Sequence, residues 1–151
     1  MCRTLLLITN IILFFSSCGY NSSTYSPYLS KTKNIQFLVE QGKINWEKRV
    51  NIDEAYKSKL FLSKAYNLDP DNIEVAILYS RACHFIGHYF EKDRIKSDST
   101  FSEGMDMAWD YFISTESFQQ GSALSEGDDK EKIIAGIENI SDDLVPLLYW
   151  W

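Results

Sequence analysis

The residues best suited to chemistry lie between positions 83 and 91. His84 and His88 are four residues apart, a spacing that places both imidazoles on one helix face, where they could chelate a metal ion. Glu91 follows about one turn later and could supply a third ligand. The sequence has no His-Glu-x-x-His pattern and no second ligand cluster. We therefore interpret the histidines as polar residues beside an apolar stripe, and keep a small His-based metalloenzyme as an alternative.

Other reactive residue types also have structural explanations. Cys83 lies on the apolar stripe without a basic partner by motif, so the sequence predicts a buried structural thiol. The acidic cluster at Asp128, Asp129 and Glu131 is explained by capping at a helix start. No phosphate-binding loop, nucleophile elbow or paired-carboxylate motif occurs. These observations predict a protein that is not an enzyme and that uses no cofactor.

Large aromatic residues form a second notable group, which comprises Trp109, Tyr111, Tyr149, Trp150 and Trp151. Aromatic residues at helical spacing usually belong to a core, where each buries about 150–250 Å². Trp109 and Tyr111 lie on opposite sides of the stripe position Ala108, so these side chains cannot all face one core. The alternative is an aromatic-lined groove for an apolar ligand or partner.

Composition sets limits on the class of protein. The chain has 151 residues, enough for one modest domain, and a net charge of -6. This charge, without a basic cluster, argues against binding to nucleic acid. The three cysteines, Cys2, Cys18 and Cys83, have neither zinc-ribbon nor disulfide-framework spacing.

The first 30 residues predict export and anchoring. The apolar run from Leu5 to Phe15 is too short to cross a membrane, which takes about 20 residues, but it fits a signal peptide over residues 1–17. The segment Phe15-Ser16-Ser17-Cys18 resembles a bacterial lipoprotein cleavage box, so Cys18 is the predicted lipid attachment site. An ordinary secretory signal is the alternative. Residues 18–30 are polar and read as a tether, which predicts a lipid-anchored domain, residues 31–151, facing the periplasm.

The domain is predicted to be all-α and organised around a helical hairpin between residues 51 and 90. Asp69 precedes Pro70 and must leave the helical region, which ends the first helix of the hairpin. Asn72 can cap the next helix, which opens at Ile73. Asn51 and Glu54 resemble a capping box at the start of the hairpin.

Further helices are predicted on both sides of this hairpin. One covers residues 33–48, and a capping box at residues 100–103 opens another after a loop at 91–100. Residues 115–126 are predicted to be loop, a further helix starts at Asp128, and Pro146 suits the first turn of a last one. The residues expected to face inward are Ile35, Leu38, Val39, Gly42 and Trp46; Ala55, Ser58, Leu62, Ala65 and Tyr66; Ala76, Tyr79, Ser80, Cys83, Ile86, Gly87 and Phe90; Phe101, Gly104, Met105, Ala108 and Phe112; and Ile133, Ile134, Ile137 and Ile140.

The residues from Leu147 to Trp151 are all large and predominantly apolar. A helix of about a turn and a half is too short to be stable without packing, and terminal repeats normally carry a polar outer face. We therefore expect this edge to drive self-association into a homo-oligomer, or to require cover by a partner or by further helices.

Helical hairpins with small residues at fixed positions and a closing Asp-Pro resemble tetratricopeptide repeats of a degenerate kind. Several features together resemble a narrower family, TatT, the lipid-anchored periplasmic component associated with TRAP transporters. They are the Cys18 box, Leu68-Asp69-Pro70-Asp71, Ser80-Arg81-Ala82, Gly104 with Ala108, and the ending 145–150, Val-Pro-Leu-Leu-Tyr-Trp.

The resemblance implies an accessory role in solute uptake. The partner would be the periplasmic solute-binding subunit of a TRAP transporter, and the chain would be an N-terminal portion of a longer helical domain. The expected partner or ligand surface comprises Arg81, Trp109, Tyr111, Tyr149 and Trp150. A general repeat scaffold for envelope assembly is the alternative without a transport role.

Overall fold

The Asp69-Pro70 turn joins the two helices around which the fold is built, α3 (Ile52–Leu68) and α4 (Ile73–Tyr89). Asp69 caps the end of α3, and the Asn72 side chain accepts a hydrogen bond from the Val75 N–H at 3.3 Å. The predicted hairpin and its turn are confirmed.

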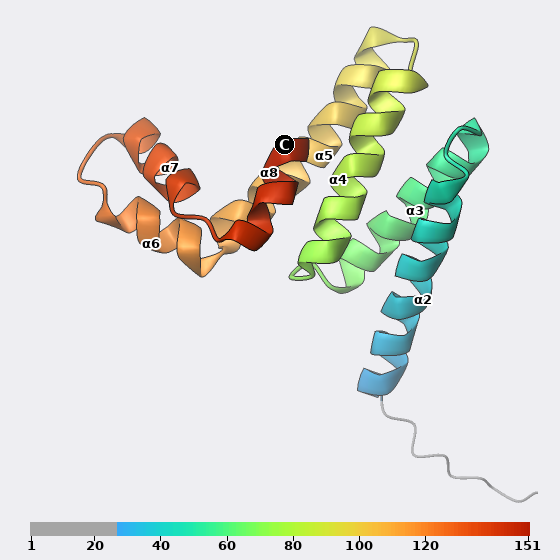
Figure 1. Cartoon of the computed structure of the whole chain (residues 1–151), viewed down its shortest axis with the longest axis horizontal. Coiled ribbons are helices and arrows are strands. Elements are labelled where there is room, and N and C mark those ends of the chain that lie inside the picture. Colours follow the sequence, from blue (N-terminus) through green and yellow to red (C-terminus); the bar gives the residue numbers. More distant parts are fainter. Residues whose placement is uncertain (1–26) are drawn as a thin grey trace, which may run out of the picture. The chain divides into compact units, whose positions relative to one another are not determined.

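This computed structural model describes residues 27–151, and its first helix is α2 (Pro27–Glu47) (Figure 1). The helix begins six residues before the predicted start and takes in the last four residues of the predicted tether. Proline suits such a start because its φ is already helical and its missing N–H would have no partner there. The predicted signal peptide and Cys18 lie outside the described residues.

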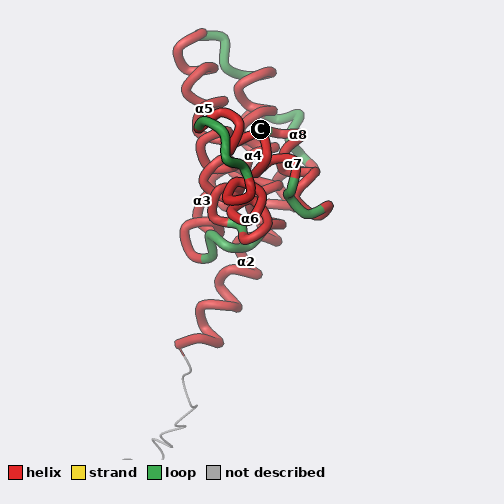
Figure 2. Tube along the Cα trace, turned by 90° about the vertical axis from the view of Figure 1, so that its left-hand side faces the viewer, coloured by secondary structure: helices red, strands yellow, loops and turns green. Residues whose placement is uncertain are grey.

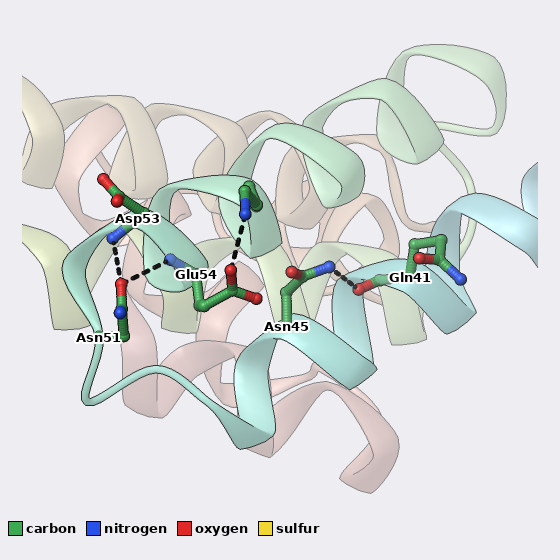
Figure 3. Close-up of polar contacts among 6 residues, drawn as sticks. Gln41, Asn45, Asn51, Asp53 and Glu54 are labelled. Carbon is green, nitrogen blue, oxygen red and sulfur yellow. Dashed lines mark hydrogen bonds and ion pairs between the residues drawn. The ribbon is translucent and has the colours of Figure 1, made fainter.

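Asparagine side chains make hydrogen bonds on both sides of the junction between α2 and α3 (Figure 3). Asn45 Nδ2 donates to the carbonyl of Gln41 at 2.6 Å, and Asn51 Oδ1 accepts from the N–H groups of Asp53 and Glu54. The Glu54 carboxylate does not reach back to the cap; it pairs with Lys57 at 2.7 Å. Asn51 therefore caps α3 as predicted, but the prediction that Glu54 completes a capping box with it is wrong.

The helix α5 (Arg94–Ser114) starts earlier than predicted. Asp93 accepts from the N–H of Lys96 at 3.1 Å and so provides a cap ahead of the expected one. Most of the predicted loop at 91–100 is therefore helical, and Thr100 is a buried residue inside the helix. On the same helix the predicted core residue Met105 is exposed, and Met107 is buried in its place.

Residues predicted to be loop form α6 (Glu116–Leu124), which pairs with α7 (Asp129–Glu138). A Cβ added at Gly121 of α6 would lie 2.4 Å from the carbonyl oxygen of Ala135 in α7. The two backbones therefore approach closely only because residue 121 has no side chain. This contact with a segment distant in sequence stabilises the helical conformation of the short, polar α6.

The start of α7 is the predicted one, with a capping box between Asp128 and Glu131. Its inward face differs from the prediction, because Ile133 and Ile134 are exposed. Glycine 136 is the residue that α7 buries, against the ring of Phe118.

A 3₁₀ turn, η1 (Asp142–Leu144), leads into α8 (Val145–Trp150), and Pro146 lies in the first turn as predicted. This helix packs against both α4 and α5, and Leu144 and Leu147 are 2% and 0% exposed. Within the predicted apolar edge, Leu147 is buried and Leu148 and Trp150 are partly buried, whereas Tyr149 and Trp151 remain exposed.

Residues 27–151 contain seven α-helices and no strand, and Figure 2 shows the short loops between them. The fold is all-α with consecutive helices paired as hairpins, and residues 31–151 form one unit. Its main core joins α3, α4, α5, α6, η1 and α8 through the buried side chains of Leu62, Ala76, Tyr79, Ala82, Cys83, Met107, Ala108, Phe112, Phe118, Leu144 and Leu147. Within residues 27–151, no helix has the length and apolar character needed to span a membrane.

Candidate functional site: an aromatic and basic groove

Side chains from three parts of the chain line a groove of about 350 Å³. Helix α4 forms the floor, and the segment at the end of α2 and helix α8 contribute the other walls. The lining residues are Trp46, Arg49, His84, Phe85, His88, Tyr89, Tyr149 and Trp150.

The α4 face carries two adjacent pairs of rings at a spacing of one turn. His84 and His88 stack with their centroids 6.2 Å apart, and Phe85 lies 4.7 Å from Tyr89. Residues four apart in a helix lie one above the other on the same face, so the four rings form a continuous surface. Tyr89 is 65% exposed at the outer end of this surface.

The wall near the end of α2 consists of an indole and a guanidinium. Trp46 meets the Phe85 ring edge to face at 5.3 Å. Arg49 lies over the Trp46 ring, with its central carbon 4.7 Å from the centroid, and donates to the Trp46 carbonyl at 3.2 Å. The stacked arginine and the aromatic contact hold Trp46 against α4.

A second arginine lies beside the same indole. The central carbon of the Arg81 guanidinium is 4.3 Å from the centroid of Trp46, and its Nε is buried without a hydrogen-bond partner. Burial lowers the pKa of Arg81, the positive charge of Arg49 lowers it further, and Glu47 opposes both. Within residues 27–151, neither Arg49 nor Arg81 forms an ion pair.

Helix α8 closes the remaining side of the groove. The Trp150 ring meets the imidazole of His84 at 5.5 Å and the Tyr149 ring at 4.8 Å. The hydroxyl of Ser80 donates to the Trp150 carbonyl at 3.4 Å, which links α8 to α4. Tyr149 is 78% exposed and forms the rim.

The groove has a charge character opposite to that of the whole chain. Its lining includes Arg49 and two histidines but no carboxylate, whereas the chain has a net charge of -6. Burial, and next the neighbouring His88, lower the pKa of His84 below its ordinary value of 6.5. A ligand that brings negative charge would therefore be favoured at this site, and a cation disfavoured.

The structure brings together only part of the predicted partner surface. Tyr149 and Trp150 line the groove and Arg81 adjoins it through Trp46. Trp109 lies elsewhere, with its ring 5.7 Å from Phe118 and 5.6 Å from Trp151.

Tyr111 is also separate from the groove, since its hydroxyl donates to the Asp71 carbonyl at 3.1 Å. This bond ties α5 to the turn between α3 and α4. Of the five predicted residues, Tyr149 and Trp150 line the groove, Arg81 adjoins it, and Trp109 and Tyr111 do not line it.

Four lining residues were not singled out for the groove from the sequence: Trp46, Arg49, Phe85 and Tyr89. Phe85 and Tyr89 repeat the four-residue spacing of His84 and His88, and this double pattern is the signal that could have identified the α4 surface. Nothing in the sequence pairs it with Trp46 and Arg49, because that contact depends on how α2 packs.

The remaining candidate residues, Glu91 and Cys83, do not line the groove. Glu91 accepts a hydrogen bond from the hydroxyl of Tyr56 in α3. Among residues 27–151, no three His, Cys, Asp or Glu side chains are placed to hold a metal ion together. Cys83 is fully buried, and burial raises the pKa of its thiol to about 12, so the reactive thiolate is scarce at neutral pH.

Comparisons with protein-family models, with curated proteins and with solved structures find no match to this chain.

Proposed function

We propose that this chain is a lipid-anchored, non-enzymatic helical adaptor of the bacterial envelope, facing the periplasm. In this role it docks the solute-binding subunit of a TRAP-type uptake system, as its resemblance to TatT implies. The groove on α4 is the docking surface. A general scaffold of envelope assembly is the competing role, and it would use the same groove for a different partner.

The observation that carries the proposal is the composition of the groove. Trp, Tyr and Arg dominate the energetic centres of protein interfaces, and here two Trp, two Tyr and one Arg line one surface. The two tyrosines, Tyr89 and Tyr149, are the most exposed of these rings and offer contact area at low conformational cost. Concave aromatic surfaces of this kind are suited to binding.

Docking is tested with the full chain in detergent and the purified TRAP solute-binding protein from the same organism. Saturable binding is expected, and Tyr149→Ser should weaken it by about fivefold or more, because truncating an aromatic side chain that contributes to an interface costs more than about 1 kcal/mol. Leu124→Ser is the matched control, since Leu124 is equally exposed on α6 but outside the groove. Absence of binding, or equal loss in both variants, would overturn the docking role.

Anchoring is tested separately at Cys18. The Cys18→Ala variant should lose labelling by a fatty-acid analogue and move from the detergent phase to the aqueous phase. Cys83→Ala is the control, because that thiol is buried in the domain. Unchanged labelling of Cys18→Ala would show that the lipid is elsewhere or absent.

A further inference from the structure

We propose that residues 31–37 of α2 form a membrane-contact arm, which lies on an anionic phospholipid surface through Lys31, Lys33 and Phe37. This inference rests on the proposed function in one respect, since it takes the lipid at Cys18 as the anchor that brings the arm to the bilayer. It adds the chemistry of the surface against which the anchored domain rests.

The first support is the distribution of charge along the chain. Residues 1–39 contain no aspartate or glutamate, and from Cys18 onward their charged side chains are those of Lys31 and Lys33. The other 112 residues hold all 21 acidic residues against 12 lysines and arginines, a net charge of -9. An anionic surface therefore attracts the arm and repels the rest of the domain, which orients the anchored molecule with the arm toward the bilayer.

The second support is that the two lysines of the arm have no acidic partner in the domain. None of the ion pairs formed among residues 27–151 includes Lys31 or Lys33, whereas Lys43 on the same helix pairs with Glu74 at 2.5 Å. Both lysines are exposed, as are the other residues from 31 to 37 apart from Ile35. Their ammonium groups are therefore accessible to lipid phosphates.

The third support is an exposed aromatic ring beside this charge. Phe37 is 57% exposed and follows Lys33 by four residues, so the two side chains share one face of α2. Helices that lie in the interface of a bilayer combine such apolar rings with basic side chains, because the ring enters the headgroup boundary while the ammonium attracts anionic lipid. Glu40, the first carboxylate of the chain, marks the end of the arm.

The fourth support is the short length of chain between the arm and the predicted anchor. Nine residues, 18–26, precede the start of α2 at Pro27, and a chain of that length spans at most about 30 Å. The arm lies a further four to ten residues along the helix, which adds about 6–15 Å. Anchoring therefore holds the arm at a high effective concentration near the bilayer, so a contact too weak to recruit a free protein is still formed.

The test is photo-cross-linking of the lipidated protein with p-benzoylphenylalanine in place of Phe37. The protein is reconstituted into vesicles of phosphatidylcholine alone or with about 30% of the anionic phosphatidylglycerol. Mass spectrometry then gives the ratio of protein cross-linked to phospholipid to protein that is not. Cross-linking should be strong on the anionic vesicles and weak on the neutral ones, and about 1 M salt should abolish the difference because it shortens the screening length to about 3 Å.

A second position controls for general proximity to the vesicle. The same group in place of Leu124, which is 82% exposed on α6, should give cross-linking that does not depend on lipid charge. Equal cross-linking at position 37 on the two kinds of vesicle overturns the inference.

Lysine variants assign the effect to the arm. Lys31→Gln combined with Lys33→Gln should lower the cross-linking ratio on anionic vesicles by up to about thirtyfold, because each lysine near such a surface contributes a factor of about five. Lys130→Gln combined with Lys132→Gln is the matched control, since these exposed lysines of α7 have the same spacing and the same charge. Thermal melts report folding of both double variants. An equal loss in the two would show that only net charge matters and would overturn the arm.

Failure of this inference can be told apart from failure of the proposed function. Flotation with the vesicles reports anchoring, and cross-linking reports the arm. If cells attach no lipid at Cys18, coupling of its thiol to a maleimide lipid supplies the anchor, and the comparisons of vesicles and lysine variants are repeated. Cross-linking that then depends on lipid charge keeps the arm and rejects the natural anchor. Anchored protein without such cross-linking rejects only the arm.

Discussion

At the scale of single residues, His84 links the groove to pH. It lies between the rings of His88, Phe101 and Trp150, and burial is the main reason why its pKa is lowered. The unfolded chain, where His84 has an ordinary pKa near 6.5, then binds more protons than the folded chain just below that pH. Stability from a neutral His84 is present above pH of about 6.5 and is lost as the pH falls toward the lowered pKa.

We therefore expect the wild type to lose stability relative to His84→Gln between about pH 7 and pH 5. Urea melts of both proteins across this range give the difference in the free energy of unfolding. For each protein, the free energy of unfolding is expressed relative to its own value at pH 8. This subtraction removes any packing effect of the substitution. A difference that stays constant from pH 8 to pH 5 would contradict the environment assigned to His84.

Capping residues show what local sequence can and cannot predict. Asn51, Asn72 and Asp128 were identified correctly, because a side chain that accepts from the backbone two or three residues later acts within its own segment. Asp93 was missed because a second capping pattern occurs at Thr100. Both are plausible locally, and only burial of Thr100 against other helices selects the first.

At the scale of elements, α6 and α7 show how packing creates a helix that composition does not predict. The segment of α6 is rich in Ser, Gln and Gly, which gives no apolar period. Its helicity is supported by Thr115 at the cap and by close contact with α7 at Gly121. The glycine is visible in the sequence. The close approach of α6 and α7 that requires it is visible only in the structure.

Gly121→Ala tests this packing. The new methyl would lie 2.4 Å from the Ala135 carbonyl and 2.4 Å from the Cβ of Asn139, so the helices must separate. We expect a loss of about 1–3 kcal/mol, the usual range for overpacking, although alanine is the better helix former. Hydrogen exchange should become faster in residues 116–138.

The control for this prediction is Gln120→Ala, on the adjacent exposed position of α6. This substitution also places an alanine in α6 but crowds no neighbour. It removes an exposed hydrogen bond from Gln120 Nε2 to Glu116 Oε1, so the free energy of unfolding should change by no more than about 0.5 kcal/mol. Equal or greater stability of Gly121→Ala than of Gln120→Ala would show that α6 and α7 are not closely packed.

At the scale of the whole unit, the groove depends on helices that are distant in sequence. Trp46 and Trp150 are more than 100 residues apart, yet both line one surface with α4. Local patterns predicted the α4 stripe, the aromatic character and the start of α8. Local patterns could not predict which rings come into contact, because this depends on how α8 packs against α4 and α5.

The packing of α8 against α4 and α5 also changes the expectation for self-association. The sequence predicts it from an uncovered apolar end, but Leu147 is fully buried and makes α8 part of the main core. Association through this edge is then expected only when α8 is detached. Leu147→Ala should cause that detachment, since truncating a buried leucine typically costs about 2–5 kcal/mol.

We expect Leu147→Ala to lower the urea midpoint, to shift tryptophan fluorescence to the red and to promote dimers at tens of micromolar protein. Val145→Ala is the control, because Val145 is 52% exposed on the same helix and its truncation should have little effect. Sedimentation velocity compares the two variants with the wild type. If all three have the same mass and the same midpoint, α8 is not held by the core, and the groove wall formed by Tyr149 and Trp150 must be held in another way.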